Sequence, residues 1–268
     1  MTDLQDYIDH VLADSPLLYW PLQETSGNAQ DATANNRDGT LTTGGLWVPT
    51  NPQASRGNKC FYLPAGNNGS VYLEYGQTLD TNAGNGMSVE FWLKPAAINT
   101  STEGVMRASD GTSHFTVTTS FASGDIRFST SGSSGRIAVA QGAPNNYWAY
   151  WVFTQDSAGS SRVYKNGVLV GGPSSQTPGT DFPNFRISNG LSSVISMNWQ
   201  HVAVFNTVLS ATRIAERWAL QTDELHEIVS RDQFPVTFPT LPLVPLNVGG
   251  TGGAPPPTEG QLWPRGNP

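Results

Sequence analysis

The chain has 268 residues, 14 basic and 21 acidic side chains and a formal net charge of −7. Because its few Lys and Arg residues are scattered singly, no cationic stripe is available to neutralise a phosphate backbone, which argues against nucleic acid as a partner. No apolar run approaches the roughly 18 residues that a transmembrane helix needs. The N-terminus has neither the basic flank nor the apolar core of a signal peptide, so we expect no membrane insertion and no secretion signal.

The composition points to a β protein. Charged residues make up 13% of the chain, about half the share of ~25% that is usual for soluble domains. Long surface helices normally carry such residues, so many short strands joined by polar turns fit this composition better. The single cysteine, Cys60, excludes a disulfide framework and a thiolate metal cluster, and we expect it to be a small hydrophobe in a strand.

Residues 2–13 predict a short helix. Thr2 can cap its N-terminus, and the apolar residues of the segment recur on one face. Those residues are Leu4, Ile8, Val11 and Leu12. Pro16 marks the end of the helix.

The segment from Leu17 to about Phe205 consists of short apolar runs broken by glycine and asparagine, a pattern typical of a sandwich or barrel. We expect strands at 17–22, 60–63, 70–75, 87–93, 114–119, 125–129, 148–154, 161–165, 185–187 and 201–205. Within 87–93, Val89, Phe91 and Leu93 share one face, which we assign to the core. The Asn166-Gly167 pair between two apolar runs predicts a β-hairpin over residues 162–170.

A second helix is expected near the end of the globular part. Ser210 can cap it, and Ile214, Trp218 and Leu225 fall on its inward face. The globular part then closes near Arg231. The predicted organisation is an N-terminal helix at 1–13, a β domain with its closing helix at 14–231, and an arm at 232–268.

The arm is rich in proline and glycine and contains nine of the 19 prolines. Proline at every third or fourth position prevents helix and sheet interior and favours an extended strap. Its apolar residues would be poor choices for a free linker, so we expect them to contact a surface, either the chain's own domain or a neighbouring chain. We prefer the second alternative and predict contacts with neighbouring subunits of a multi-copy assembly. The candidate contact residues are Phe234, Phe238, Leu241, Leu243, Leu246 and Trp263.

Four groups of segments follow one another along the globular part. They are DSPLLYWPL at 14–22 with RDGTL at 37–41, MSVEFWLKP at 87–95, the Trp-containing run at 148–154 with VYKNGV at 163–168, and HVAVFN at 201–206 followed by Leu209, Ser210 and Ile214. In this order they resemble the laminin-G-like domains of the concanavalin-A-like lectin/glucanase family over about residues 14–220. The resemblance implies a jelly roll, an all-β sandwich of two antiparallel sheets.

The chain departs from this family at one place. Members often carry an acidic pair just before the last strand, where this chain has Asn198-Trp199-Gln200. Any role tied to that acidic position is therefore not carried over.

A second resemblance lies in the arm. The segment PLNVGGTG at 245–252 is similar to a short Gly-Gly-Thr-Gly segment common in bacteriophage tail-fibre proteins. A virion protein reaches external glycans without a signal peptide, because it is assembled in the host cytoplasm and released by lysis. We therefore expect this chain in a virion.

Glycoside hydrolysis is the enzymatic activity to weigh on this fold. It needs two carboxyl groups about 5 Å apart for retention, or further apart for inversion. Family members that cleave glucans carry a Glu-x-Asp-x-Glu strand, and this chain has no such triplet. Glu90, the strand carboxylate near a plausible concave face, is better assigned to a hydrogen bond or a rim contact with sugar.

Nucleophilic and histidine chemistry find no support in the sequence. No Gly-x-Ser-x-Gly elbow is present, and Cys60 has no histidine nearby in the sequence. The four histidines, His10, His114, His201 and His226, fall on separate elements and none pairs at metal-ligand spacing. We expect no catalytic residue and no metal site at these positions.

Calcium is the one cofactor to weigh, since laminin-G-like domains often hold one at the sandwich rim. Asp31, Asn36 and Asp38 supply hard oxygen ligands within one loop. The same residue types also favour turns, because Asn and Asp tolerate left-handed backbone, and we prefer the turn.

The aromatic segment at 147–153 offers flat rings that could stack on a sugar. Its alternation assigns Tyr147, Trp151 and Phe153 to the core and turns Trp148 and Tyr150 to the other face. Core packing explains most of the segment, and Trp148 and Tyr150 are the candidates for stacking on a glycan.

These observations predict a non-enzymatic virion component, a minor tail, fibre or head-decoration protein with a lectin-like domain that contacts host-surface glycan. The first alternative is a dedicated carbohydrate-binding module, with or without calcium, and a less favoured one is a glycoside hydrolase. The fold alone does not choose among them.

Overall fold

The structure is a computed structural model that describes residues 4–42, 44–49, 59–64, 71–81, 85–95, 102–109, 113–120, 125–130, 136–140, 148–177, 181–187 and 196–220. The chain divides into two units, Met1–Arg231 and Asp232–Pro268, and every described residue lies in the first. The contact residues predicted in the arm therefore lie outside the described residues, as do Thr2, Tyr147 and Leu225.

The first of two antiparallel sheets has eight strands. They are β1 (Leu18–Trp20), β3 (Leu46–Pro49), β4 (Lys59–Leu63), β6 (Met87–Pro95), β11 (Ala149–Gln155), β12 (Ser160–Lys165), β13 (Val168–Ser175) and β15 (Met197–Phe205). Their order is β13-β12-β11-β6-β15-β4-β3, with β1 paired to the C-terminal half of β15.

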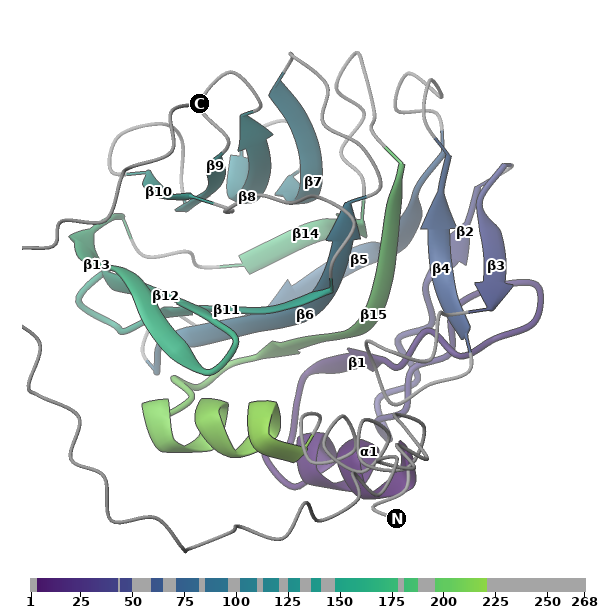
Figure 1. The fold of residues 1–268 in the computed structure, drawn as a ribbon, viewed down its shortest axis with the longest axis horizontal. Coiled ribbons are helices and arrows are strands. Elements are labelled where there is room, and N and C mark those ends of the chain that lie inside the picture. Colours follow the sequence, from purple (N-terminus) through teal and green to yellow (C-terminus); the bar gives the residue numbers. More distant parts are fainter. Residues whose placement is uncertain are drawn as a thin grey trace, which may run out of the picture. The chain divides into compact units, whose positions relative to one another are not determined.

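The second sheet has seven strands. They are β2 (Thr40–Leu41), β5 (Leu73–Asp80), β7 (Thr102–Ser109), β8 (Ser113–Ser120), β9 (Asp125–Thr130), β10 (Ile137–Ala140) and β14 (Asp181–Ile187). They follow the order β10-β9-β8-β7-β14-β5-β2, and the two sheets stack face to face (Figure 1). The predicted all-β, two-sheet jelly roll is confirmed.

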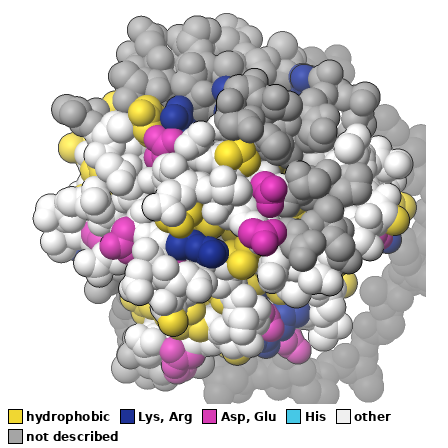
Figure 2. All heavy atoms as spheres, turned by 180° about the vertical axis from the view of Figure 1, so that it is seen from behind, with side chains coloured by type: hydrophobic (Ala, Val, Ile, Leu, Met, Phe, Trp, Pro, Cys, Tyr) yellow, Lys and Arg dark blue, Asp and Glu magenta, His cyan; other side chains and the backbone are white. Residues whose placement is uncertain are grey.

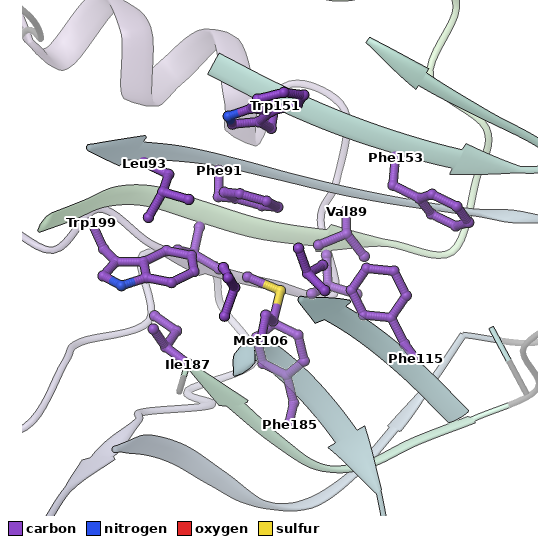
Figure 3. Packing of buried hydrophobic residues seen from close by; sticks show 14 of the residues in the cluster. Val89, Phe91, Leu93, Met106, Phe115, Trp151, Phe153, Phe185, Ile187 and Trp199 are labelled. Carbon is purple, nitrogen blue, oxygen red and sulfur yellow. The ribbon is translucent and has the colours of Figure 1, made fainter. Parts of the chain in front are cut away.

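The main core lies between the sheets. Val89, Phe91 and Leu93 of β6 point toward the second sheet, whose Met106 and Phe115 point back at them (Figure 3). This is the face that the alternation along 87–93 predicts. Burying these side chains supplies most of the driving force for stacking the two layers, at roughly 25 cal/mol for each Å² of apolar surface removed from water.

Two helices cover the outer face of the first sheet (Figure 1). The first is α1 (Leu4–Leu12), and the second spans residues 211–220. The predicted N-cap of the second helix is confirmed, because Ser210 Oγ accepts a hydrogen bond from the Arg213 backbone N–H at 3.1 Å. Tyr7, Val11 and Ile214 carry the helices' buried contacts to a second apolar cluster on this sheet. Neither helix is long and apolar enough to cross a membrane, and the described part holds no other that is.

The predicted hairpin joins β12 to β13. Lys165 pairs with Val168 across the turn, and both turn residues have positive φ, 52° at Asn166 and 79° at Gly167. Asn and Gly are the residues that adopt this left-handed backbone at least cost, which is why the pair marks a two-residue turn.

Four of the observed strands were not predicted. These are β2, β3, β7 and β10. Strand β2 has two residues and β10 is the short segment IAVA, while β7 contains Gly104 and few β-branched residues. Strands β3 and β10 contain residues that favour strands, but each has only four residues, and such short segments form because their neighbours in the sheet pair with them.

Candidate functional site

The outer face of the first sheet is closed. Tyr150 and Glu90 have no exposed surface, and Trp148 is 9% exposed, because the two helices pack over them. The alternation along β11 is as predicted, with Trp151 and Phe153 in the main core. The opposite face is covered rather than open, so the glycan contact assigned to Trp148, Tyr150 and Glu90 stays a prediction that this packing does not favour.

Glu90 lies on this closed face, and its Oε2 atom is contacted from two sides, while its Oε1 atom has no hydrogen-bond partner among the described residues. The Tyr150 hydroxyl donates a hydrogen bond to Glu90 Oε2 at 2.8 Å. The Arg217 guanidinium of the second helix forms an ion pair with the same oxygen and reaches Asp14 with its other arm. Arg213 Nε also pairs with Asp14, at 2.6 Å. Asp14, Arg217 and Glu90 therefore form a series of alternating charges, which connects the segment after α1 and the second helix to the middle of β6.

Aromatic rings surround these charges. The Trp92 ring stacks on Tyr150 and on Trp218, with centroid distances of 5.3 and 5.5 Å. Its indole N–H donates to the Tyr7 hydroxyl at 3.0 Å. The polar ends of these large side chains are thus paired inside the cluster, as buried polar groups must be.

Burial sets the electrostatics of this cluster. It raises the pKa of the Glu90 carboxyl, and the neighbouring Arg217 charge opposes that rise. For Arg217, burial disfavours the charged form, but Glu90 raises its pKa above the ordinary value. Each of the two groups faces the opposite charge away from solvent, which suits a structural ion pair rather than an acid or base that meets a substrate.

The predicted calcium loop is organised by its own carboxylates. Asp31 Oδ1 accepts hydrogen bonds from the backbone N–H groups of Tyr19 and Thr33 at 3.0 and 3.1 Å. Asp31 Oδ2 accepts from Thr33 Oγ1 at 2.7 Å and from the Arg37 N–H at 2.8 Å. These four donors fill the four lone-pair positions of a carboxylate.

The remaining residues of that loop also serve the turn. Asp38 Oδ1 accepts from the Asp31 backbone N–H at 2.8 Å, and Asn36 has a φ of 52°. No group of three or more His, Cys, Asp or Glu side chains placed to hold a metal occurs among the described residues. Asp31, Asn36 and Asp38 therefore do not fit a calcium ion in this arrangement, and the alternative assignment as a turn accounts for them.

The outer face of the second sheet carries a transverse polar row, which we call the open-face row. Each member is paired in register with the next one, and each lies between core-facing neighbours on its strand. From β2 to β9 the row is Thr40, Glu74, Arg186, Arg107, Thr116 and Ser129. Among the described residues seen in Figure 2, charged side chains of both signs lie in small separate groups between hydrophobic and other side chains.

Charge is unevenly placed along the open-face row. Arg186 Nη2 pairs with Glu74 Oε1 at 2.9 Å, and its guanidinium lies over the Tyr72 ring at 4.5 Å from the centroid. Arg107 Nη2 donates to Ser109 Oγ at 2.6 Å. The row therefore combines two cations, one carboxylate, three hydroxyls and an adjacent aromatic ring on one face of the sheet.

Sequence reasoning did not find this row. The alternation of its members with buried residues along each strand was the available signal that they face outward. The pairing of β7 with β14, however, could not be predicted from the sequence of either strand. Arg186 and Arg107 become neighbours only through that pairing.

The comparisons with known proteins agree with this architecture. The family model described as the concanavalin A-like lectin/glucanases superfamily matches residues 65–215. No curated protein matches the chain.

Solved structures with the same fold include receptor-binding domains of botulinum neurotoxins. The binding domain of botulinum neurotoxin DC in complex with SialylT has a TM-score of 0.61 and 15% identity, with 78% of this chain and 52% of that chain covered. A botulinum neurotoxin type C structure, concerned with cell entry through two ganglioside molecules, has a TM-score of 0.62 and 15% identity, with 79% and 52% covered. The chain thus spans about half the length of these proteins, and the likeness establishes the fold.

Proposed function

The chain belongs to the concanavalin A-like lectin/glucanases superfamily, and from this premise we propose that it is a non-enzymatic binding and structural component of a bacteriophage virion. The observation that carries the binding proposal is the asymmetry of the sandwich. One outer face is closed by two helices, and the other presents the open-face row. The open face is the surface that we assign to recognition of host-surface glycan.

The closed face argues against hydrolysis. Glycoside cleavage needs two carboxyl groups that flank a bound sugar on an accessible surface. Glu90 is fully buried and paired with Arg217, and Asp14 is joined to it through the same guanidinium rather than across an open gap. This arrangement supports binding as the mode of action.

The virion assignment rests on the arm. Its spaced prolines favour an extended segment, and the Gly-Gly-Thr-Gly segment at 249–252 is similar to one common in phage tail fibres. An arm that is already restricted by proline loses little further entropy when it wraps a neighbouring subunit. We propose that it attaches the domain to a tail, fibre or capsid, in several copies.

Truncation after Arg231 tests this assignment. The shortened chain should fold and stay soluble, because the described sandwich and both helices precede the cut, but it should no longer join the particle. The full chain, expressed beside it during phage assembly, is the control. Incorporation of the truncated chain at the level of the full chain would contradict the role of the arm.

A dedicated carbohydrate-binding module is the second candidate. The open face favours it, and the neurotoxin domains of the same fold include a complex with SialylT. A glycan array distinguishes the candidates, because a dedicated module should bind a defined glycan without the arm. We expect that binding to be unaffected by chelation of calcium, given the filled lone pairs of Asp31.

A further inference from the structure

Two arginines face each other on the open side of the second sheet. Arg107 of β7 and Arg186 of β14 are direct partners in the strand register. Like charges directly opposite each other on neighbouring strands are destabilising. Arg186 also pairs with Glu74 and so contributes to the sheet. Arg107 is therefore the member of the pair that breaks this rule without a compensating charge in the part of the chain that the structure describes, and such positions are candidates for function.

The two cations differ in how they are compensated. Arg186 has the Glu74 carboxylate at 2.9 Å and the Tyr72 ring beneath its guanidinium. Among the described residues Arg107 has no carboxylate partner, and its one hydrogen bond runs from Nη2 to Ser109 Oγ. The Nε atoms of both arginines are buried without an acceptor from the described ranges, so the difference between them lies in the carboxylate partner. Arg107 therefore keeps a positive charge and unused donors beside an already neutralised arginine.

The unused donors are arranged for one kind of group. A guanidinium presents its N–H groups as a planar fork that matches a carboxylate in two parallel hydrogen bonds. On the far side of Arg107 the row continues with Thr116 and Ser129, whose hydroxyls can donate to and accept from the hydroxyls of a sugar. An inorganic anion without hydroxyl groups would not need the hydroxyls of Thr116 and Ser129.

We infer that the open-face row binds an acidic sugar, whose carboxylate pairs with Arg107 and whose hydroxyls lie over Thr116 and Ser129. The inference rests on the proposed binding function and names the ligand class of the same surface. Before binding, the row has two cations and one carboxylate. The ligand supplies the second carboxylate, so that each of the two cations has one opposite charge.

A paired glycan array tests the inference. Each uronate- or sialate-bearing oligosaccharide is printed beside its carboxyl-reduced, neutral form, and the full chain is compared with Arg107→Gln and Arg127→Gln. Arg127 is the matched control, because it lies outside the row on β9, with β8 between its strand and β7, and pairs with Asp125 at 3.8 Å, and its substitution changes the net charge equally. Thermal midpoints are measured for all three proteins.

The full chain should bind at least one acidic oligosaccharide and not its reduced form. Arg107→Gln should weaken that binding at least tenfold, the loss expected for a charge-assisted hydrogen bond, while Arg127→Gln stays within twofold. Arg107→Gln should unfold no earlier than the full chain, because it removes the repulsion with Arg186. A midpoint well below that of the full chain would overturn the inference, since Arg107 would then be structural.

Three binding results would also overturn it. They are equal binding of acidic and reduced forms, an equal loss in both variants, and displacement of the sugar by millimolar inorganic phosphate. The inference is also overturned if the full chain binds none of the acidic glycans on the array. If the full chain binds neutral glycans and Arg107→Gln binds them equally well, the assignment of an acidic ligand is wrong but the proposed binding function is not. The arm truncation tests virion attachment independently.

Discussion

Glu90 and Arg217 form a fully buried ion pair that connects the middle of β6 to the helix over residues 211–220. The two residues are 127 positions apart in the chain. Arg217 also pairs with Asp14, just beyond α1, so one guanidinium fixes both terminal helices to the same sheet. This contact closes the first sheet and leaves the second as the surface available for recognition.

Removing one partner of this pair should be costly. We expect Arg217→Met to destabilise the domain by about 3–5 kcal/mol, because it leaves a buried carboxylate without its counter-charge. The double variant Glu90→Gln/Arg217→Met should cost clearly less than the sum of the single variants. Urea unfolding of the four proteins measures this coupling, and strictly additive losses would show that the two side chains do not stabilise each other.

The hairpin turn should be sensitive to a Cβ atom. Gly167 has a φ of 79°, and an added Cβ would lie 3.1 Å from the Trp218 side chain. We expect Gly167→Ala to lower the free energy of unfolding by about 1–2 kcal/mol, the cost of left-handed backbone. Gly76→Ala is the control, because nothing lies within 4 Å of its Cβ position; it should change stability by less than about 0.5 kcal/mol. Equal effects at both sites would contradict the turn geometry.

Cys60 should react slowly with thiol reagents while the domain is folded. Burial raises the pKa of its thiol to about 12, so almost no thiolate is present at pH 8. We expect a disulfide-exchange reagent to label the protein at pH 8 at the rate of unfolding and to label it rapidly in urea. Fast labelling of the native protein, independent of stabilising conditions, would show that this strand is accessible.

His10 should make the domain lose stability on acidification. Burial, and then the charges of Arg213 and Arg217, lower its pKa below the usual 6.5, while Glu216 and Asp14 oppose this. Because the unfolded chain binds the proton more tightly, the contribution of neutral His10 is complete above pH 6.5 and decreases as the pH falls below it. The unfolding free energy of the full chain should therefore fall more steeply from pH 8 to 5 than that of His10→Gln. Parallel profiles would rule out a role for His10 in this range.

Much of the fold follows from local pattern. The alternation along β6, the Asn166-Gly167 turn and the Ser210 cap each depend on residues within a few positions of one another, and all three were predicted correctly. The family resemblance then supplied the two-sheet architecture, which the short strands alone did not distinguish from a barrel.

The site was harder to predict because it depends on distant partners. In isolation Arg217 has the pattern of an exposed helical arginine, and its burial follows from Glu90, which it meets across the sheet. Tyr150 looked free to stack on a sugar because the sequence did not show that the helices lie on that face. The open-face row arises only when β14 pairs with both β5 and β7.

The most direct test of the account compares glycan binding by the full chain with binding by one variant inside the open-face row and one variant outside it. Thr116→Glu places a carboxylate in the open-face row next to Arg107, where it would compete with a ligand. Val168→Glu changes charge equally at a side chain on β13 that is 64% exposed and outside the row. The account predicts that the full chain and Val168→Glu bind the same glycans and that Thr116→Glu binds none. Unchanged binding by Thr116→Glu, or absence of glycan binding by the full chain, would contradict it.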